Sequence, residues 1–429
     1  MRIHIKNKLT ITVLIACILM AFTSSCYESL KKTAKKNYAY MYNPTTTSLH
    51  PNFNIYHQND SSSVLLIKFY PGELLFNQAN ERIVYQAQIQ FQYKLYNLKT
   101  KLLDDSSSFS LTLDLDEVKE EMVTFIPVKA KFGNEYMLQA VTQDLKRRTQ
   151  HREAIRVDKT NRFNNQNYLF RIYGSNAPVF NARIDSTNFF KVEYSYGRVD
   201  SFIVKYFKNN FYYPVVPSMD ITVRDYFESP DSQMVHNLKD ASVFKLNKEG
   251  LYIFQIAPGN ETGAGISCFD ADFPYLKKSD DLARGLKYLL TDKEFNEIMV
   301  APNKKLKIDE FWLKAADNNI DVARDLIRIY YNRAYLANVY FTSYKEGWKT
   351  DRGMVYLVYG LPDIIYRSDN SERWVYQNSR TDEEISFIFT QEIHPYSNNH
   401  YVLSRGETVQ TRWSDAISSW RKGKPFSLE

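Results

Sequence analysis

The side chains that most often carry out catalysis or bind metals are few in this sequence and lie far apart. It has three cysteines (Cys17, Cys26 and Cys268) and no H-E-x-x-H, H-x-H or mixed Cys/His metal pattern. It also has no Gly-x-Ser-x-Gly nucleophile motif and no phosphate-binding glycine loop. We therefore predict a protein that is not an enzyme and needs no cofactor or metal. The seven histidines are His4, His50, His57, His151, His236, His394 and His400.

One pair of histidines and one cysteine are candidates for chemistry that need a closer reading. His394 and His400 are near enough to share a loop, but two ligands without a nearby carboxylate make a poor metal site. Cys268 is either a nucleophile or a small buried side chain beside Ile266 and Phe269. Free cysteines are usually buried, and no nearby histidine would activate this one, so we favour the buried side chain.

The run Gly347-Trp348-Lys349-Thr350-Asp351-Arg352-Gly353 concentrates residues with special properties. The two glycines permit tight backbone, the tryptophan is a large anchor, and Thr350 and Asp351 can bond local N–H groups. One interpretation is a recognition or catalytic site with Asp351 as the base. The other is a structural connection between a long helix and the following strand. We favour the second, because no other acid, histidine or metal cluster lies nearby in the sequence.

The N-terminus predicts export and lipidation. Arg2, Lys6 and Lys8 precede the apolar stretch 9–22, which is too short to span a bilayer comfortably but suits a signal peptide. Small residues then lead to Cys26, as in a bacterial lipobox. We therefore predict cleavage after residue 25 and a lipid on Cys26 that anchors the protein in a membrane. The alternatives are a plain secretory signal cleaved near Ser25 and an uncleaved N-terminal anchor.

The charge is mild and mixed. The whole chain carries +6, and removing residues 1–25 takes away three basic and no acidic residues, which leaves +3. Basic and acidic residues are interspersed, so the sequence does not predict a nucleic-acid partner. Four lysines after the lipid site would either lie on anionic headgroups or belong to a solvated tether. They are Lys31, Lys32, Lys35 and Lys36.

Hydrophobic periodicity predicts two sheet-rich regions after a tether at residues 26–55. In the region 56–160, residues 85–95 and 109–115 alternate apolar and polar side chains, which is typical of strands with one buried face. In the region 161–276, candidate strands are 168–173, 189–196, 201–206, 242–246 and 251–256, with a hairpin turn at 248–250. We expect antiparallel, sandwich-like sheets in both regions.

Residues 277–429 predict helices packed on a small antiparallel sheet. Ser279 is a candidate cap for one helix, and Thr291 with Glu294 forms a capping box for the next. A third helix should carry Trp312, and the clearest should run from Ala323 to Phe341. We expect strands at 354–359, 373–377 and 384–390, then an amphipathic helix at 409–420. The fold class is thus multidomain, β-rich plus α+β.

The run at 347–353 resembles the family of lipoproteins that carry a GWxTD domain. Further motifs occur in order at 309–312, 333–341, 356–363 and 373–376, so the resemblance covers roughly residues 280–420. The family brings no established activity to transfer. The candidate motif or interface residues are Gly347, Trp348, Thr350, Asp351, Arg352, Gly353, Gly360, Pro362, Asp363 and Trp374.

A second resemblance concerns residues 360–376. Gly360, Pro362 and Asp363, followed by Trp374 and Tyr376, are similar to the small helix-plus-three-strand lipoprotein of the outer-membrane barrel-assembly machine. That lipoprotein tends to be helical before the glycine, whereas 354–359 here predicts a strand.

Two functions follow as expectations. The first is a non-enzymatic, lipid-anchored subunit of an outer-membrane complex for assembly, secretion or transport, with an outer-membrane β-barrel protein and other envelope lipoproteins as partners. The second is a peptidoglycan- or glycan-binding envelope protein or hydrolase, which the abundance of tyrosine (32) and phenylalanine (27) suggests. An open cleft with paired carboxylates and exposed rings would distinguish the second from the first.

Overall fold

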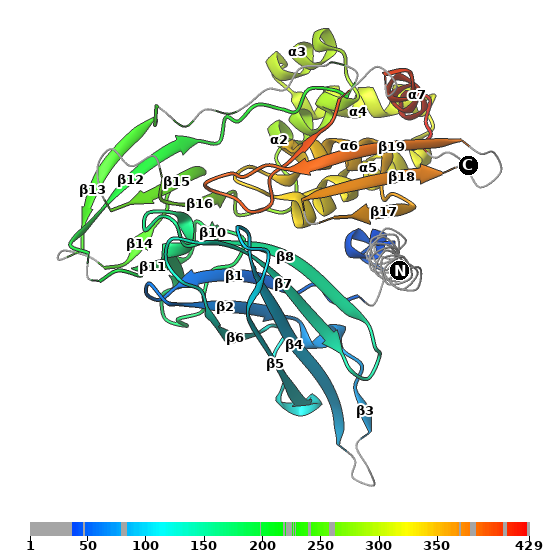
Figure 1. Ribbon diagram of the computed structural model, residues 1–429. Coiled ribbons are helices and arrows are strands. Elements are labelled where there is room, and N and C mark those ends of the chain that lie inside the picture. The colour runs from blue at the N-terminus through cyan, green and yellow to red at the C-terminus, as the bar shows by residue number, and fades with distance from the viewer. Residues whose placement is uncertain are drawn as a thin grey trace, which may run out of the picture.

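The computed structural model describes residues 37–426, with gaps at 46–47, 79–83, 198, 218, 220–224, 226, 228, 239–241, 257–261, 369, 378–382 and 406–409. The predicted signal peptide, Cys26, the four lysines after it and the start of the tether lie outside the described residues. Figure 1 shows two β-rich parts and a third in which helices pack on a small sheet. This confirms the predicted fold class. Among the described helices, none is long and apolar enough to cross a bilayer.

The first part consists of two antiparallel sheets that enclose a common core. One sheet has the order β1-β2-β6, and the other has the order β3-β4-β7-β8 with β5 also paired to β4. Leu65, Phe91 and Leu138 are completely buried between them. The strands are β1 (Asn52–His57), β2 (Ser62–Phe69), β3 (Asn77–Gln78), β4 (Tyr85–Asn97), β5 (Leu103–Asp114), β6 (Met122–Lys129), β7 (Glu135–Asp144) and β8 (Gln150–Asp158).

The second part also has two sheets, with the orders β10-β16-β15-β12-β13 and β14-β11-β9. Rings of Phe190, Phe202 and Phe254 fill the space between them. The strands are β9 (Tyr168–Ile172), β10 (Arg183–Asp185), β11 (Phe189–Tyr194), β12 (Ser201–Lys208), β13 (Ser232–Asn237), β14 (Phe244–Lys245), β15 (Gly250–Gln255) and β16 (Ala264–Phe269).

The predicted hairpin at 248–250 is wrong. β14 pairs with β11 in one sheet, and β15 pairs with β12 and β16 in the other. The chain therefore crosses between the two sheets at these residues instead of folding back on itself. A short turn next to two apolar runs looks the same in both cases, because pairing partners are not visible in local sequence.

The third part packs six helices on a four-stranded antiparallel sheet of order β17-β18-β19-β20. The capping box of Thr291 and Glu294 is confirmed, whereas the N-cap of the preceding helix is Lys278 and not Ser279. The elements are α2 (Ser279–Gly285), α3 (Asp292–Val300), α4 (Lys304–Ala315), α5 (Ile320–Phe341), α6 (Asp351–Tyr359), α7 (Gln410–Arg421), β17 (Ile364–Arg367), β18 (Ser371–Gln377), β19 (Glu384–Gln391) and β20 (Tyr401–Leu403).

The predicted strand at 354–359 is wrong, because these residues form helix α6. All six side chains from Met354 to Tyr359 are buried, so the helix shows no polar face and its apolar run resembles that of a buried strand. The Thr350 hydroxyl caps the helix by accepting the Gly353 N–H at 3.1 Å. A helix at this place is what the resemblance to the small barrel-assembly lipoprotein implies.

Residues 37–55 differ from the predicted tether. Residues 39–42 form a 3₁₀ turn that lies beside the edge of β17, where the Tyr38 N–H donates to the Ile365 carbonyl at 2.8 Å. Ala39 and Tyr42 are buried, and β1 begins at Asn52. The aromatic side chains of this mostly polar stretch pack against the core of the third part, which lies far later in the sequence.

Candidate functional site

The segment Gly347–Gly353 joins α5 to α6 inside the core of the third part. A Cβ atom on Gly347 would overlap the backbone of Ala337, and one on Gly353 would overlap the backbone carbonyl of Gly347. Both glycines have ordinary negative φ, so the requirement is space and not left-handed backbone. They let the turn at 347–349 and the first turn of α6 approach α5 closely.

Thr350 and Asp351 both serve the start of α6. The Thr350 hydroxyl donates to the Gly347 carbonyl at 2.7 Å while it caps the helix. Asp351 lies in the first turn, where the helix dipole favours an acid, and its carboxylate accepts the Leu403 N–H at 2.8 Å. The same carboxylate pairs through both oxygens with Arg405, whose side chain is buried. These bonds occupy Asp351 in the interior, so the geometry does not present it as a general base.

Arg352 points into the interior from the same turn. Its guanidinium lies 3.8 Å from the ring centre of Tyr401 and bonds the Tyr42 hydroxyl at 3.2 Å and the side chain of Asn399. A carboxylate oxygen of Glu372 lies 3.5 Å away. The arginine is 2% exposed and the glutamate 1%, so this is a fully buried ion pair that needs its neighbours to be satisfied.

Glu372 is the centre of a wider network of charges. It accepts the Tyr42 hydroxyl at 2.7 Å and the Trp374 indole N–H at 3.0 Å, and it faces Arg367 as well as Arg352. Burial and the Glu372 carboxylate raise the pKa of Tyr42 well above its ordinary value, so its hydroxyl stays a neutral donor.

The network also reaches the first β-rich part. Arg367 on β17 makes a two-pronged ion pair with Glu153 on β8, at 3.1 and 3.2 Å. Burial would raise the pKa of Glu153, but the Arg367 and His151 side chains outweigh it and hold this pKa at about 2. One connected set of charges therefore ties together the motif, the N-terminal segment and the first β-rich part.

Trp348 and Trp374 are both interior. Trp348 is 1% exposed and packs against Tyr213 and Tyr288, with ring centres 5.6 and 6.4 Å away. Its indole N–H has no hydrogen-bond partner among the described residues. Trp374 is completely buried and packs against Phe389. Neither ring is available on the surface of this structure as a contact for a partner or a sugar.

Gly360, Pro362 and Asp363 shape the turn from α6 into β17. Gly360 has φ +84°, which only glycine adopts easily, and its carbonyl accepts the Tyr376 hydroxyl at 2.9 Å. Pro362 is buried, and the Asp363 carboxylate accepts the Gln377 N–H at 2.8 Å. These residues thus close the turn and align β17 with β18.

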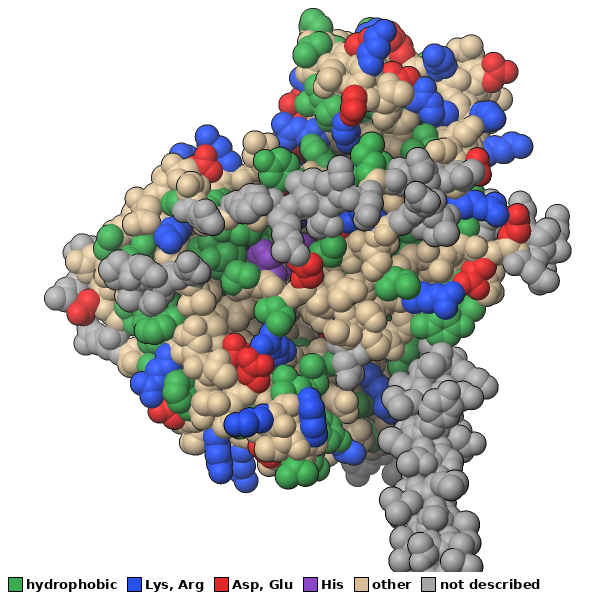
Figure 2. Space-filling view, turned by 45° about the horizontal axis from the view of Figure 1, so that its top comes forward, with side chains coloured by type: hydrophobic (Ala, Val, Ile, Leu, Met, Phe, Trp, Pro, Cys, Tyr) green, Lys and Arg blue, Asp and Glu red, His purple; other side chains and the backbone are tan. Residues whose placement is uncertain are grey.

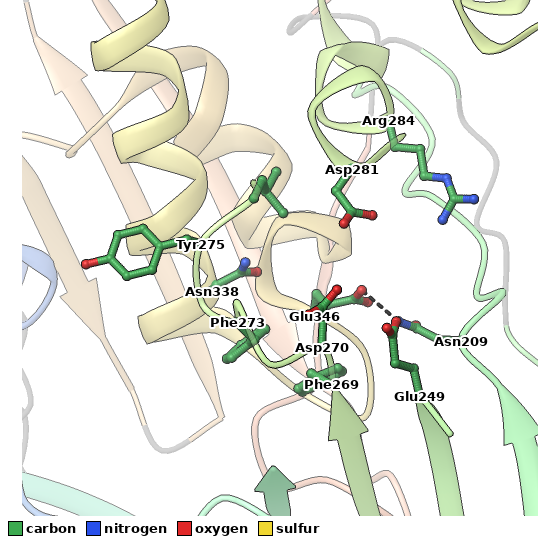
Figure 3. Close-up of a pocket in the computed structure, with 11 residues that line it drawn as sticks. Asn209, Glu249, Phe269, Asp270, Phe273, Tyr275, Asp281, Arg284, Asn338 and Glu346 are labelled. Atoms are coloured by element: carbon green, nitrogen blue, oxygen red, sulfur yellow. Dashed lines mark hydrogen bonds between the residues drawn. The ribbon is translucent and has the colours of Figure 1, made fainter. Parts of the chain in front are cut away.

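A small pocket lies beside the motif, at the junction of the second and third parts (Figure 3). Glu249, Asp270, Asp281 and Glu346 line it, and its free volume is about 60 Å³. Burial and then the neighbouring Asp270 raise the pKa of Glu249, and burial likewise raises the pKa of Asp281. Among the described residues, no three His, Cys, Asp or Glu side chains are arranged to hold a metal ion.

His394 and His400 do come together, with ring centres 5.1 Å apart. His394 also stacks on Tyr344 at 4.2 Å, and burial, with His400 nearby, lowers its pKa to about 3. The pair is therefore part of an aromatic cluster between the second and third parts. Cys268 is completely buried, and burial raises its pKa to about 11, which makes the thiol a poor nucleophile.

The structure brings the candidate residues at 347–353 and Trp374 into one core and places Gly360, Pro362 and Asp363 at the neighbouring turn. Sequence reasoning missed the residues that complete this core, namely Tyr42, Asn338, Glu372, Asn399 and Arg405. One signal was present, since Glu372 is an acid two residues before Trp374 on a strand and therefore shares its buried face.

Comparisons with known proteins support the motif assignment. Residues 250–422 match the family model of the GWxTD domain. Residues 250–422 therefore carry a GWxTD domain, which confirms the sequence-based recognition of that domain. No curated protein matches the chain.

Several solved structures match at low similarity. Two are of beta-glucuronidase 2 from Bacteroides uniformis, one bound to a cyclophellitol aziridine and one a calcium-binding mutant. Both are 14% identical with a TM-score of 0.18, over 37% and 30% of this chain and 16% and 14% of theirs. A glycosyl hydrolase family 2 member from Bacteroides cellulosilyticus is 11% identical, with TM-score 0.18, over 33% of this chain and 19% of its own. The chain thus matches less than a fifth of their length, and the likeness carries no argument about activity.

Proposed function

We propose that the protein is a non-enzymatic, lipid-anchored subunit of an outer-membrane complex for assembly, secretion or transport. The observation that carries the proposal is that the motif residues are used for packing and bonding inside the domain. The side chains of Trp348, Thr350 and Arg352 are buried, and Asp351 is held in an ion pair with Arg405. The residues that define the domain therefore build a rigid scaffold, and surfaces elsewhere remain for partners.

The position of the N-terminal segment supports a membrane-proximal third part. Residue 37 is bonded to β17 through its side chain and lies eleven residues after Cys26. Eleven residues span at most about 40 Å even when fully extended. A lipid on Cys26 would therefore keep the edge of β17 near the membrane, with the rest of the molecule available to an outer-membrane β-barrel protein or other lipoproteins.

The test is mild crosslinking in intact cells, followed by purification through a C-terminal tag and mass spectrometry. We expect a β-barrel protein and other lipoproteins in a fixed ratio to the chain. Cys26→Ser should abolish both labelling with a fatty-acid analogue and membrane association. Cys17→Ser, a cysteine within the signal, is the matched control and should change neither. A solitary monomer after crosslinking would contradict the proposal.

A glycan-binding or hydrolase function is the second candidate, and the carboxylate-lined pocket is the observation that favours it. Tyr275 also lines this pocket and is 53% exposed. The size of the pocket argues against this candidate, because its free volume of about 60 Å³ is far below the volume of typical ligand pockets, about 300 Å³ or more. Retention of the purified chain on peptidoglycan, lost in Tyr275→Ala and in Glu249→Gln, would establish this candidate over the first.

A further inference from the structure

Strand β13 forms one edge of the five-stranded sheet. Its six residues pair with β12 from Ser201↔Asn237 to Tyr206↔Ser232, and the sheet order ends there. Within the described residues, no strand pairs with its other side. An edge strand presents a row of backbone N–H and C=O groups that can pair with another chain.

β13 also lacks the features that usually protect an edge. Its sequence, SQMVHN, contains no proline and no Lys, Arg, Asp or Glu. Met234 and Val235 point to opposite faces of the strand, and they are 58% and 68% exposed. Figure 2 shows hydrophobic side chains grouped at the surface on the left of the molecule, the side on which β12 and β13 lie in Figure 1.

Three other sheet edges are covered or interrupted. The edge of β17 is bonded by Tyr38, and the edge of β9 is bonded by the following segment, where the Val179 N–H donates to Phe170. β6 carries Pro127 and ends in Lys129. The backbone edges of β17 and β9 are therefore covered and that of β6 is interrupted by a proline, whereas the backbone edge of β13 is open among the described residues.

An apolar pocket opens directly beside β13. Ser232, Met234 and His236, which share one face of the strand, form one wall, and the aromatic rings of Tyr206, Phe244, Tyr252 and Phe254 are among the other residues that line it. Its free volume is about 240 Å³. An apolar cavity of about 150 Å³ accepts benzene, so this one can hold a phenylalanine or leucine side chain.

The rim of the pocket has one sign of charge. Lys245 and Lys248 line it, and none of its lining residues is acidic. Both ammonium groups lie over rings, at 5.1 Å from Phe189 and 5.9 Å from Tyr206, which keeps them at the rim. A ligand that matches this pocket would place an apolar side chain inside it and acidic side chains next to the two lysines.

We propose that β13 binds an extended segment of a partner protein as an additional strand, with an aromatic or leucine side chain in the pocket and acidic residues beside Lys245 and Lys248. In such strand addition, backbone bonds supply affinity and the pocket for alternate side chains supplies specificity. The inference rests on the proposed function and specifies the chemistry of the partner segment.

The probe is the capped synthetic peptide DTVTFTVTD, titrated against the full chain in detergent. Replacing its phenylalanine by alanine should weaken binding at least about tenfold. Two further versions of the peptide carry N-methyl groups, one on the odd-numbered residues and the other on the even-numbered residues. Their affinities for the protein should differ, because only one of these two sets of N–H groups faces β13. Equal binding by both versions, no effect of the alanine, or no binding at about 1 mM would overturn the proposal.

Substitutions in the protein complete the test. Met234→Asp should weaken peptide binding at least about tenfold without changing the melting temperature. Phe125→Asp on β6 is the matched control, since Phe125 is 64% exposed and lies in another sheet, and it should bind like the wild type. In cells, a complex that survives Met234→Asp would refute the strand-addition site but leave the proposed function intact. A wild-type chain without partners would refute the proposed function itself.

Discussion

Two sheet edges in this molecule are treated in opposite ways. The edge of β17 is covered by the N-terminal segment, whose Asn37 side chain bonds Asp363 and Ile365 and whose Tyr38 N–H bonds Ile365. The edge of β13 has no such cover among the described residues and exposes Met234 and Val235. The segment that follows the predicted lipid anchor thus covers the edge of β17. The edge of β13, on the other side of the molecule, stays open among the described residues (Figure 1).

The surroundings of the two edges differ as well. Next to β17, the motif and Glu372 form a buried core whose charges are matched by partners. Next to β13, the side chains are exposed and border a pocket. Substitutions near β17 should therefore reduce stability, whereas substitutions on β13 should affect binding and leave stability nearly unchanged.

The largest effect is expected at Gly353. In Gly353→Ala, the new Cβ would overlap the backbone carbonyl of Gly347, which cannot rotate away. We expect a loss of at least about 4 kcal/mol in the free energy of unfolding, or failure to fold. Chemical denaturation measures it. Gly72→Ala is the control, because a Cβ there meets no atom within 4 Å. Equal stabilities would show that the motif is not closely packed.

Trp348→Ala should lower the free energy of unfolding by about 3–5 kcal/mol, because removal of a fully buried ring leaves a cavity in the core. The melting temperature of the full chain measures this loss. An unchanged melting temperature together with lost partner binding would make Trp348 an interface anchor. The contrast between the two edges would then fail, since the motif itself would belong to a binding surface.

The sequence predicted those elements in which periodicity is strong. The apolar positions from Ala323 to Phe341 do form α5, and Ala87 to Leu95 are the buried face of β4. The capping box at Thr291 is a local hydrogen-bond pattern between residues three apart, so the sequence predicted it as well. Tyr85, at the start of β4, is exposed because it lies at the end of the sheet and not over the core.

The rest depended on contacts between distant residues. Helix α6 was taken for a strand because burial on all sides removes the polar face that reveals a helix. The role of Tyr42 rests on a partner, Glu372, that is 330 residues away. Likewise, the Arg405 that pairs with Asp351 lies beyond four intervening strands, β17 to β20. No local pattern identifies such partners.

The charge network next to β17 predicts a pH dependence. The pKa of Glu153 is about 2 in the folded protein against 4.5 ordinarily, so its carboxylate stabilises the fold above pH 4.5. That contribution is lost as the pH falls from 4.5 towards 2. Because Glu153 is partly exposed, we expect Glu153→Gln to cost only about 1–2 kcal/mol at pH 7.

Denaturation of wild type and Glu153→Gln between pH 7 and pH 3 tests this dependence. The difference in stability should shrink below pH 4.5. Glu121→Gln is the control, because Glu121 pairs with Lys68 at the surface and is 54% exposed. A difference that stays constant with pH would mean that Glu153 contributes by packing, and β17 would then be tied to the first part without its ion pair.

The smallest effect is expected on β13 itself. Val235 is 68% exposed, so Val235→Ala should change the free energy of unfolding by no more than about 0.5 kcal/mol. Val375 on β18, which pairs with β17, is 1% exposed, and Val375→Ala should cost about 2 kcal/mol. The two variants remove the same two methyl groups from one strand of each region, so their stabilities can be compared directly by urea denaturation. If Val235→Ala costs as much as Val375→Ala, β13 is already packed against another part of the chain, and its edge is not open to a partner.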